Sequence, residues 1–501
     1  IVRRLNGMFS FGIWDAKREH WVLGRDRIGI KPLYFFSNTK GLAFASELKP
    51  IMHLPWFSGD LDYTALELYM QFHYVPAPRT IFAKVSKVRP GTCLIASRKR
   101  VDVYRYWNAA DFVRDRIAEP EEDALADELA ELVDSSVRMR LLSDVPVGTF
   151  LSGGYDSSLV TSSACAVSDK PVRSFSVGFP DRKFDESGCA EQVAGAAGSD
   201  HHTLIADSET LRAVTDDLPR YYDEPFADSS AIPTLIISKL IRTGVTVALG
   251  GDGGDELFCG YNRHEWLKKF SHVPASLSGL LSKLLRTVPW EKCAKAAALL
   301  EWTAPEDRYR CLHNMWRQGE IQSLCPRFGD AENPVRDYFR MDLPLEERTM
   351  YCDLETYLVD DILTKVDRAS MSVSLESRVP LLDHRLVEFA LRLPLNMKLR
   401  RGERKYLLRR VLYRRVPRKY VDRPKQGFAL PLPAFLRNTF RQRMCELLDK
   451  KSLEDHGLFC PAYVRELLNG FLSGRNSAHY RLWTLISFQL WWNRYKAFVR
   501  T

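Results

Sequence analysis

The sequence has no closely spaced pair of cysteines and no long hydrophobic run. Its ten cysteines form no C-x-x-C pair, which argues against a zinc ribbon or a redox dithiol. No apolar stretch approaches the ~20 residues that a membrane helix requires, and no signal-peptide pattern opens the chain. We therefore expect a cytoplasmic protein with no membrane partner, in which most cysteines are buried and reduced.

The sequence also lacks the G-x-x-x-x-G-K-[ST] pattern of a Walker loop, so kinase-type γ-phosphoryl transfer is not the first expectation. Its 501 residues exceed what one hydrophobic core usually supports, which predicts two or more domains. Acidic residues are scarce in one segment, because 398–419 carries eleven Lys and Arg against the single acid Glu403.

A different phosphate-binding pattern occurs at 145–158, where a short apolar run is followed by Ser-Gly-Gly-Tyr-Asp-Ser-Ser. This predicts a buried strand, a glycine turn and a helix running to about Val167. Adjacent glycines bring bare N–H groups close to a ligand, and the helix start adds unpaired donors and the positive end of its dipole. The alternative is a tight turn that binds nothing. The candidate residues for binding ATP through its pyrophosphate are Leu151, Ser152, Gly153, Gly154, Asp156, Ser157 and Ser158.

A second glycine-rich loop, 250–256, reads Gly-Gly-Asp-Gly-Gly-Asp-Glu and follows another buried apolar run. Its glycines permit close approach to a nucleotide, so Gly250 and Gly251 are candidate ATP-binding residues. Asp156 and Asp255 are predicted to share a Mg²⁺ ion that neutralises the departing pyrophosphate. A flexible surface turn is the alternative for this loop.

Helices and strands alternate from about residue 121 onward, which predicts a parallel, doubly wound sheet. Such sheets bind ligands beyond the carboxyl ends of their strands. Val177, near the end of the predicted strand 172–179, is therefore a candidate contact for adenine, with an ordinary core valine as the alternative. Before residue 100, apolar residues alternate at a period near two, which predicts antiparallel strands at 5–14, 20–25, 26–35 and 42–47.

Several segments resemble glutamine-hydrolysing asparagine synthetases. Residues 145–158 resemble the loop that cleaves ATP between its α and β phosphates, and 250–256 resembles the second signature of the family. The closing half of the family's glutaminase domain is similar to 5–11, 25–34 and 45–49. The family pattern continues at 360–371 and 375–384.

The resemblance implies an α/β protein with two parts. Residues 1–112 would be the end of a class II glutamine amidotransferase domain, an α+β remnant of an N-terminal-nucleophile sheet. Residues 113–501 would be a doubly wound ATP-pyrophosphatase domain with added helices, and the boundary is expected around 108–120. In the family an N-terminal cysteine releases ammonia from glutamine. This chain begins with Ile1 and its first cysteine is Cys93, so we expect no glutaminase activity. Trimming of the sequence would explain the missing cysteine, and an inactive remnant of the domain is the alternative.

The resemblance implies an ATP-dependent carbon–nitrogen ligase. The β-carboxylate of aspartate would attack ATP to give β-aspartyl-AMP, and ammonia, normally released from glutamine, would displace AMP to give asparagine. The implied cofactors are ATP and Mg²⁺. The expected partners are aspartate, ATP, and glutamine or ammonia, and a homodimer is left open.

Further roles follow from the resemblance. Lys425 matches a family lysine that faces the ATP phosphates, and Lys405 is a second candidate. Asp252 takes the place of a glutamate thought to assist proton removal from ammonia, with a carboxylate one methylene shorter. Asp383 and Arg378 are candidates for gripping the ammonium and carboxylate of an amino acid, although ion pairs between helices would explain them too.

Two features of the sequence leave alternative functions open. Some asparagine synthetases carry an arginine for the carboxylate of aspartate in the stretch that corresponds to 228–231, and this chain has none there. A related synthetase that amidates another acid, or closes a lactam, is therefore the first alternative. The basic segment 398–419 has the pattern of a helix with one solvated face, and RNA binding or modification is the second alternative, although no RNA-binding motif accompanies the charge.

Overall fold

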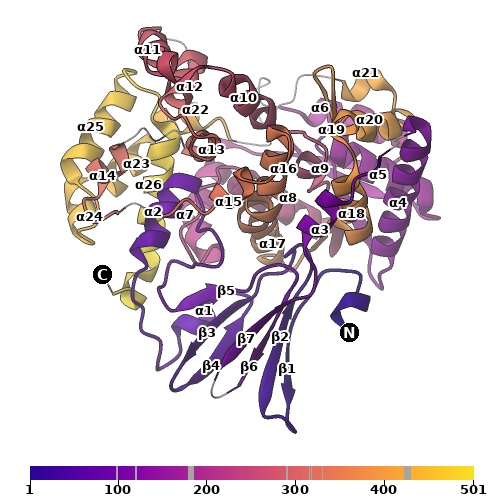
Figure 1. Cartoon of the computed structure of the whole chain (residues 1–501), viewed down its shortest axis with the longest axis horizontal. Coiled ribbons are helices and arrows are strands. Elements are labelled where there is room, and N and C mark those ends of the chain that lie inside the picture. The colour runs from indigo at the N-terminus through magenta and orange to yellow at the C-terminus, as the bar shows by residue number, and fades with distance from the viewer. Residues whose placement is uncertain are drawn as a thin grey trace.

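The structure, a computed structural model, describes residues 1–97, 100–118, 121–178, 185–288, 291–314, 316, 319–329, 331–422 and 430–500. Antiparallel strands form one end of the molecule, and a larger helical body that encloses a parallel sheet forms the rest (Figure 1). Within the described residues, no helix combines the length and the apolar character needed to cross a bilayer.

Two antiparallel sheets are built from the N-terminal strands. In spatial order they are β1 (Ser10–Asp15), β2 (His20–Arg25), β6 (Thr92–Ala96) and β7 (Val101–Arg105), and then β4 (Gly41–Ala45), β3 (Tyr34–Asn38) and β5 (Val85–Lys87). The prediction of antiparallel strands is confirmed, but 26–35 is a strand only from Tyr34. The buried Asp26 carboxylate accepts the backbone N–H groups of Gly29, Ile30 and Lys31 at 2.7–2.9 Å, and this holds a loop in place of a strand.

Five parallel strands form the central sheet in the order β10 (Asp200–Ile205), β9 (Arg173–Gly178), β8 (Val147–Phe150), β11 (Val247–Leu249) and β12 (Glu376–Arg378). The predicted doubly wound sheet is therefore confirmed. The chain runs outward from β8 in one direction through β9 and β10, and then returns to the other side of β8 at β11. Open α/β sheets bind ligands beyond the carboxyl ends of their strands at such a switch point, which here is formed by β8 and β11.

Helices surround the sheet and fill the rest of the body. Their bounds are α1 (Leu48–Met52), α2 (Tyr63–Phe72), α3 (Ala109–Arg114), α4 (Glu122–Leu141), α5 (Tyr155–Val167), α6 (Ser187–Ala197), α7 (Ser208–Tyr221), α8 (Ala231–Gly244), α9 (Gly254–Leu257), α10 (Asn262–Ser271), α11 (Ala275–Arg286), α12 (Glu291–Leu300), α13 (Pro305–Asn314), α14 (Glu320–Leu324), α15 (Arg336–Phe339), α16 (Leu345–Glu355), α17 (Thr364–Met371), α18 (His384–Arg392), α19 (Leu395–Lys398), α20 (Tyr406–Tyr413), α21 (Arg418–Val421), α22 (Leu432–Arg437), α23 (Arg441–Leu447), α24 (Lys450–Glu454), α25 (Pro461–Leu472) and α26 (His479–Tyr495). Short 3-10 or π helices are η1 (Val2–Arg4), η2 (Leu358–Leu363), η3 (Pro380–Leu382) and η4 (Lys496–Phe498), and β13 (Leu399–Arg400) pairs with β14 (Glu403–Arg404).

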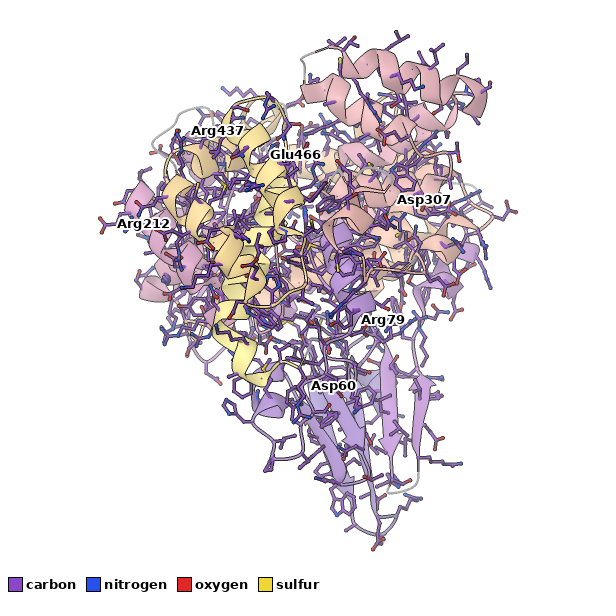
Figure 2. All side chains as sticks on the ribbon, turned by 90° about the vertical axis from the view of Figure 1, so that its left-hand side faces the viewer. Asp60, Arg79, Arg212, Asp307, Arg437 and Glu466 are labelled. Atoms are coloured by element: carbon purple, nitrogen blue, oxygen red, sulfur yellow. The ribbon has the colours of Figure 1, made fainter. Side chains whose placement is uncertain are left out.

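The end of the chain ties the helical body to the N-terminal part. Helix α26 is buried on most sides, with Trp483 and Trp491 at most 1% exposed. Beyond it, the Arg500 backbone N–H donates to Gly59 O at 2.8 Å, and Arg500 O accepts from Leu61 N–H at 3.0 Å. Figure 2 shows this junction, where Asp60 lies between the strands and the yellow C-terminal helix.

The basic segment 398–419 is largely neutralised within the chain. Only 406–413 forms the predicted helix, α20, because the preceding residues form the β13–β14 hairpin. The buried face of α20 includes Leu407 and Leu412, and basic residues of this segment pair with acids on α4. These pairs include Arg410–Asp123 at 2.9 Å, Arg414–Asp127 at 2.6 Å and Arg415–Asp134 at 2.6 Å. The charge that suggested a nucleic-acid partner therefore has an internal explanation.

A buried ion-pair cluster joins α10 to α16 in the helical body. Both Asp353 oxygens are in use: Oδ1 accepts from Tyr309 OH at 2.5 Å, and Oδ2 lies 2.7 Å from His264 Nε2. Arg263 Nη2 lies 3.0 Å from Asp353 Oδ1, and its guanidinium lies over the rings of both Tyr261 and Tyr357. Burial alone would raise the pKa of Asp353, but Arg263 and His264 outweigh it and lower the pKa to about 2.

We expect Asp353→Asn to lower the free energy of unfolding by about 2 kcal/mol at pH 7, because a charged acceptor of several hydrogen bonds is lost. The folded pKa of about 2 lies below the unfolded value of 3.8, so this stability is complete above the unfolded pKa and is lost as pH falls through the folded one. Urea unfolding should give the same difference at pH 7 and pH 5. Asp337→Asn, at a side chain that is 92% exposed, is the control. A difference no larger than that of the control would contradict the prediction.

Candidate functional site

The two glycine-rich loops lie against each other at the switch point of the sheet. One follows β8 and leads into α5, and the other follows β11 and leads into α9. A Cβ added at Gly251 would lie 2.7 Å from the Ser157 backbone N, and one at Gly254 would overlap the Asp156 carboxylate. Glycine is therefore required at both positions for the loops to approach each other.

Three of the predicted residues meet at this junction. The Lys405 ammonium forms ion pairs with both carboxylates, Asp156 Oδ2 and Asp255 Oδ1, the second at 2.7 Å. Lys405 is only 4% exposed, and its backbone adopts the left-handed conformation with φ of +56°, which is uncommon for a residue other than glycine. Its N–H donates to Phe258 O at 3.0 Å, which fixes the lysine beside the second loop. Strained backbone of this kind is concentrated at functional sites.

The carboxylate pair suits a cation. Burial disfavours the charged form of Lys405, but Asp156 and Asp255 outweigh this and hold the pKa of the lysine well above its usual value. Among the described residues, no group of three or more His, Cys, Asp and Glu side chains could hold a metal on its own. Mg²⁺ commonly binds one or two carboxylates together with substrate phosphates and water, so these two hard oxygen donors fit a Mg²⁺ ion that arrives with ATP.

The turn before α5 has the geometry of an anion site. Gly153 has φ of +73°, and Gly154 is the N-cap of α5 without a side-chain hydrogen bond to the first turn. The hydroxyls of Ser152 and Ser157 lie 3.0 Å apart beside this turn, and the Ser158 hydroxyl is buried. The Thr161 hydroxyl donates to Thr149 Oγ1 at 2.9 Å and pins the helix to β8. The first N–H groups of a helix have no partner within the helix and its dipole is positive there, so this turn suits an anion.

A second buried group of polar side chains lies near Asp252. We call Asp228, Ser230, Asp361 and Lys365 the Lys365 group; Lys365 Nζ lies 2.7 Å from Asp228 Oδ2 and 2.8 Å from Ser230 Oγ. Burial favours the neutral form of Asp228, but Lys365 lowers the pKa of its carboxyl well below the usual value. Burial and the neighbouring Asp228 raise the pKa of Asp361 well above its usual value. Burial also raises the pKa of Asp252, Lys365 lowers it in part, and Asp156 and Asp255 raise it further.

A π-helix presents the acids of this region. Residues Leu358–Leu363 form η2, and wide turns of this kind often occur at functional sites. The adjacent Asp360 and Asp361 are both buried, at 4% and 3% exposure. Asp360 accepts from the Ala77 N–H at 2.7 Å, whereas Asp361 Oδ1 has no hydrogen-bond partner among the described residues. A buried carboxylate oxygen without a partner is costly and requires an explanation, although the same carboxyl interacts with Asp228.

Sequence reasoning did not identify the Lys365 group. The stretches 228–231 and 360–371 both drew attention, but nothing in the sequence indicated that Asp228 and Lys365, 137 residues apart, form an ion pair. The sequence has no arginine at 228–231, yet the structure supplies a cation there, Lys365 of α17. Tertiary structure alone carries this information.

Two further predicted residues, Asp383 and Arg378, contact other parts of the chain. Asp383 caps α18, accepts from Arg140 Nη1 at 2.9 Å and Asn6 Nδ2 at 3.1 Å, and is 1% exposed. Arg378 donates to Glu376 Oε1 and to the carbonyls of Arg140 and Leu142. These contacts favour the alternative of internal ion pairs over direct contact with an amino acid.

Two further candidates, Val177 and Leu151, are buried. Val177 is 5% exposed and packs in the core, and its proposed contact with adenine stays a prediction. Leu151 is likewise buried, with its N–H bonded to Phe175 O at 2.9 Å. Lys425 lies outside the described residues. The last residue described before it, Asp422, accepts a hydrogen bond from Tyr155 OH in the anion loop at 3.0 Å.

Comparison with known proteins gives matches over both parts of the chain. The asparagine synthase family matches residues 128–493, and the glutamine amidotransferase domain matches residues 1–107. An asparagine synthetase [glutamine-hydrolyzing] 1 of Bacillus subtilis is 32% identical over 497 residues, which cover 97% of this chain and 77% of that protein. A putative asparagine synthetase [glutamine-hydrolyzing] 2 of Methanocaldococcus jannaschii is 31% identical over 74% of this chain and 73% of its own length.

More distant relatives have other names. Amidase chry2 of Gibberella zeae is 25% identical over 94% of this chain and 76% of that protein. The family match over most of the chain, the coverage of the synthetase relatives and the sheet with its paired glycine loops agree. The chain therefore belongs to the asparagine synthase family and is an ATP-dependent amidotransferase ligase whose residues 1–107 match a glutamine amidotransferase domain.

Proposed function

We propose that the protein converts aspartate to asparagine through β-aspartyl-AMP. The β-carboxylate oxygen attacks the α-phosphorus of ATP, a P–O bond forms, and the bond to the β-phosphate breaks to release pyrophosphate. Ammonia then attacks the acyl carbon, loses a proton and expels AMP. One observation carries this proposal: Asp156 and Asp255 follow the two strands of the switch point and share one buried lysine.

The anion loop and Lys405 act on the leaving half of ATP. The N–H groups at the start of α5 and the Ser152 and Ser157 hydroxyls bind phosphate oxygens, because the helix start attracts negative charge. Lys405 balances the charge that develops as pyrophosphate departs. Asp156 and Asp255 would hold Mg²⁺, which supplies charge neutralisation for pyrophosphate when bound.

Asp252 is assigned to remove the proton from the attacking ammonia. A general base works best when its pKa lies near the working pH, and burial with two neighbouring aspartates moves the pKa of Asp252 in that direction. The carboxylate is shorter by one methylene than the glutamate of the related signature. The Gly250 N–H donates to Arg378 O at 2.8 Å, and this contact fixes the start of the loop that positions Asp252.

The role assigned to the Lys365 group is binding of the amino acid that accepts the ammonia. Asp228 and Lys365 neutralise each other, which leaves Asp361 with an unfilled carboxylate oxygen in a buried setting. The ammonium of aspartate would supply the missing hydrogen bond and charge. Lys365, held by Asp228 and Ser230, is the nearby cation that favours the ionised form of Asp361.

Asp361→Asn should raise the KM for aspartate about tenfold, since a charge-assisted hydrogen bond is lost. The raised pKa of Asp361 means that ammonium binding requires its ionisation, so the KM of the unaltered protein should fall as pH rises. The variant should lose that slope. Aspartate-dependent exchange between ATP and labelled pyrophosphate measures this without ammonia. An unchanged KM for ATP is the internal control, and an unchanged KM for aspartate would remove Asp361 from the acceptor site.

The proposal is tested by incubating the chain with ATP, Mg²⁺, an ammonium salt and aspartate, and measuring asparagine, AMP and pyrophosphate. We expect all three in equal amounts.

A second candidate, amidation of a different carboxylic acid, is favoured by the relatives named amidases. ATP–pyrophosphate exchange that depends on another acid and not on aspartate would select it.

A further inference from the structure

Helix α11 is packed with its polar side toward the protein and its apolar side toward solvent. Ser278 and Ser282 are each 2% exposed, and their hydroxyls donate to Leu300 O and Ala297 O on α12 at 2.7 and 2.8 Å. The leucines of the same helix face outward with the following exposed fractions: Leu277 49%, Leu280 59%, Leu281 37% and Leu284 57%. Surface helices of globular proteins usually show the opposite arrangement.

The helix lies at the periphery of the molecule. Figure 1 shows α11 and α12 at the upper edge, far from the antiparallel sheets, and the pink helices in this part of the chain again reach the top of Figure 2. The small core beneath the pair contains Ala298, Leu299 and Cys311, and no leucine of α11 belongs to it. Four leucines on one exposed face form the kind of patch that marks an interaction site.

Charge around this patch favours an anionic partner. Helix α11 carries Lys283 and Arg286 and no acid, and 275–301 has four basic residues against two acids, Glu291 and Glu301. Arg286 pairs with Glu301, whereas Lys283 is exposed and makes no ion pair among the described residues. A second copy of the chain would bring like charges together across a symmetric contact, which is unfavourable.

The patch also differs from a protein-binding surface. Protein interfaces depend on a few aromatic or arginine side chains that fill pockets, and the sequence of α11 contains no aromatic residue. A leucine face bordered by an exposed lysine, here Lys283, is instead typical of helices that lie in the plane of a membrane interface.

We propose that α11 binds the surface of an anionic lipid bilayer. Its four leucines would enter the boundary between headgroups and acyl chains, and Lys283 would contact lipid phosphates. This is attachment to one face of a membrane, without a spanning segment, and it departs from the expectation that the protein has no membrane partner. The proposal does not depend on the reaction that the protein catalyses.

Cosedimentation of the full chain with vesicles tests it. Vesicles of phosphatidylglycerol and phosphatidylcholine should bind the protein, pure phosphatidylcholine should bind it much less, and added salt should weaken binding. Replacing two leucines together, Leu280→Asp with Leu284→Asp, should lower the affinity at least about tenfold. Lys283→Glu should lower binding to the anionic vesicles alone.

Val103→Asp is the matched control, since Val103 is 69% exposed on β7 in the antiparallel part of the molecule. Circular dichroism and the urea midpoint should show that all variants are folded. Equal binding by the leucine variant and the control, or no binding to anionic vesicles, would overturn the proposal. A dimer in solution that the leucine variant dissociates, without vesicle binding, would assign the patch to a second copy and overturn it too.

Discussion

Replacing Asp156 by Asn is expected to lower aspartate-dependent release of pyrophosphate about a thousandfold, since ~4 kcal/mol of charge stabilisation is lost at the leaving group. Asn keeps the size of the side chain but cannot form the ion pair with Lys405, and it binds a divalent cation far less well. The concentration of Mg²⁺ needed for half-maximal rate should rise in the variant.

Asp169→Asn provides the matched control, because Asp169 is exposed near the opposite end of α5. The steady-state rate of pyrophosphate release should be measured for both proteins at several Mg²⁺ concentrations. Should the Asp156 variant keep more than about a tenth of the rate, the carboxylate would lie outside the reaction centre.

A methyl group added at Gly251 is expected to separate the two loops. The new Cβ of Gly251→Ala would lie 2.7 Å from Ser157 N and 3.0 Å from Ser157 Cα, and both atoms belong to the backbone. One loop must therefore move, and a displacement of about 1 Å can lower the rate roughly a hundredfold. The expected loss of stability is smaller, about 1–3 kcal/mol.

Gly188→Ala is the matched substitution, because Gly188 lies in α6 with open space around its Cβ position. It should leave the rate unchanged and slightly stabilise the helix. Rates of pyrophosphate release and urea midpoints should be measured for both. A rate for Gly251→Ala within about threefold of the unaltered protein would mean that the loops do not need their close contact.

Local patterns were sufficient to predict the sheet and both loops. The apolar run that ends in Leu151 and the glycines after it specify a strand and a turn with little help from the rest of the chain. The loop at 250–256 carries the same kind of local information. The distance between the loops follows from topology, since β8 and β11 are neighbours in the sheet. These predictions rest on chemistry that is contiguous in sequence.

Residues that depend on tertiary contacts were harder to predict. Lys405 was the weaker of two candidate lysines because no local pattern distinguishes it within a segment rich in Lys and Arg. Its place between two aspartates depends on where α20 begins, in a left-handed residue that follows a hairpin. Asp361 and Lys365 form a buried polar group only with Asp228, which lies on a distant stretch of chain.

Asp383 and Arg378 were predicted to bind an amino acid, and in the structure both are paired within the chain. Their charges suggested an amino acid ligand, but Arg140 and Arg385 occupy the carboxylate of Asp383, and backbone carbonyls occupy Arg378. Charge in a sequence does not show whether its partner is a ligand or another part of the chain. Geometry is needed to decide between them.

The central claim is that Asp156, Asp255 and Lys405 hold ATP so that it is cleaved between the α and β phosphates. The most direct measurement uses [α-³²P]ATP with aspartate, an ammonium salt and Mg²⁺, followed by separation of the labelled nucleotides. We predict that the label appears in AMP, in step with pyrophosphate, and that Asp156→Asn lowers its rate of appearance about a thousandfold. Label appearing in ADP, or AMP formed equally well by the variant, would contradict the claim.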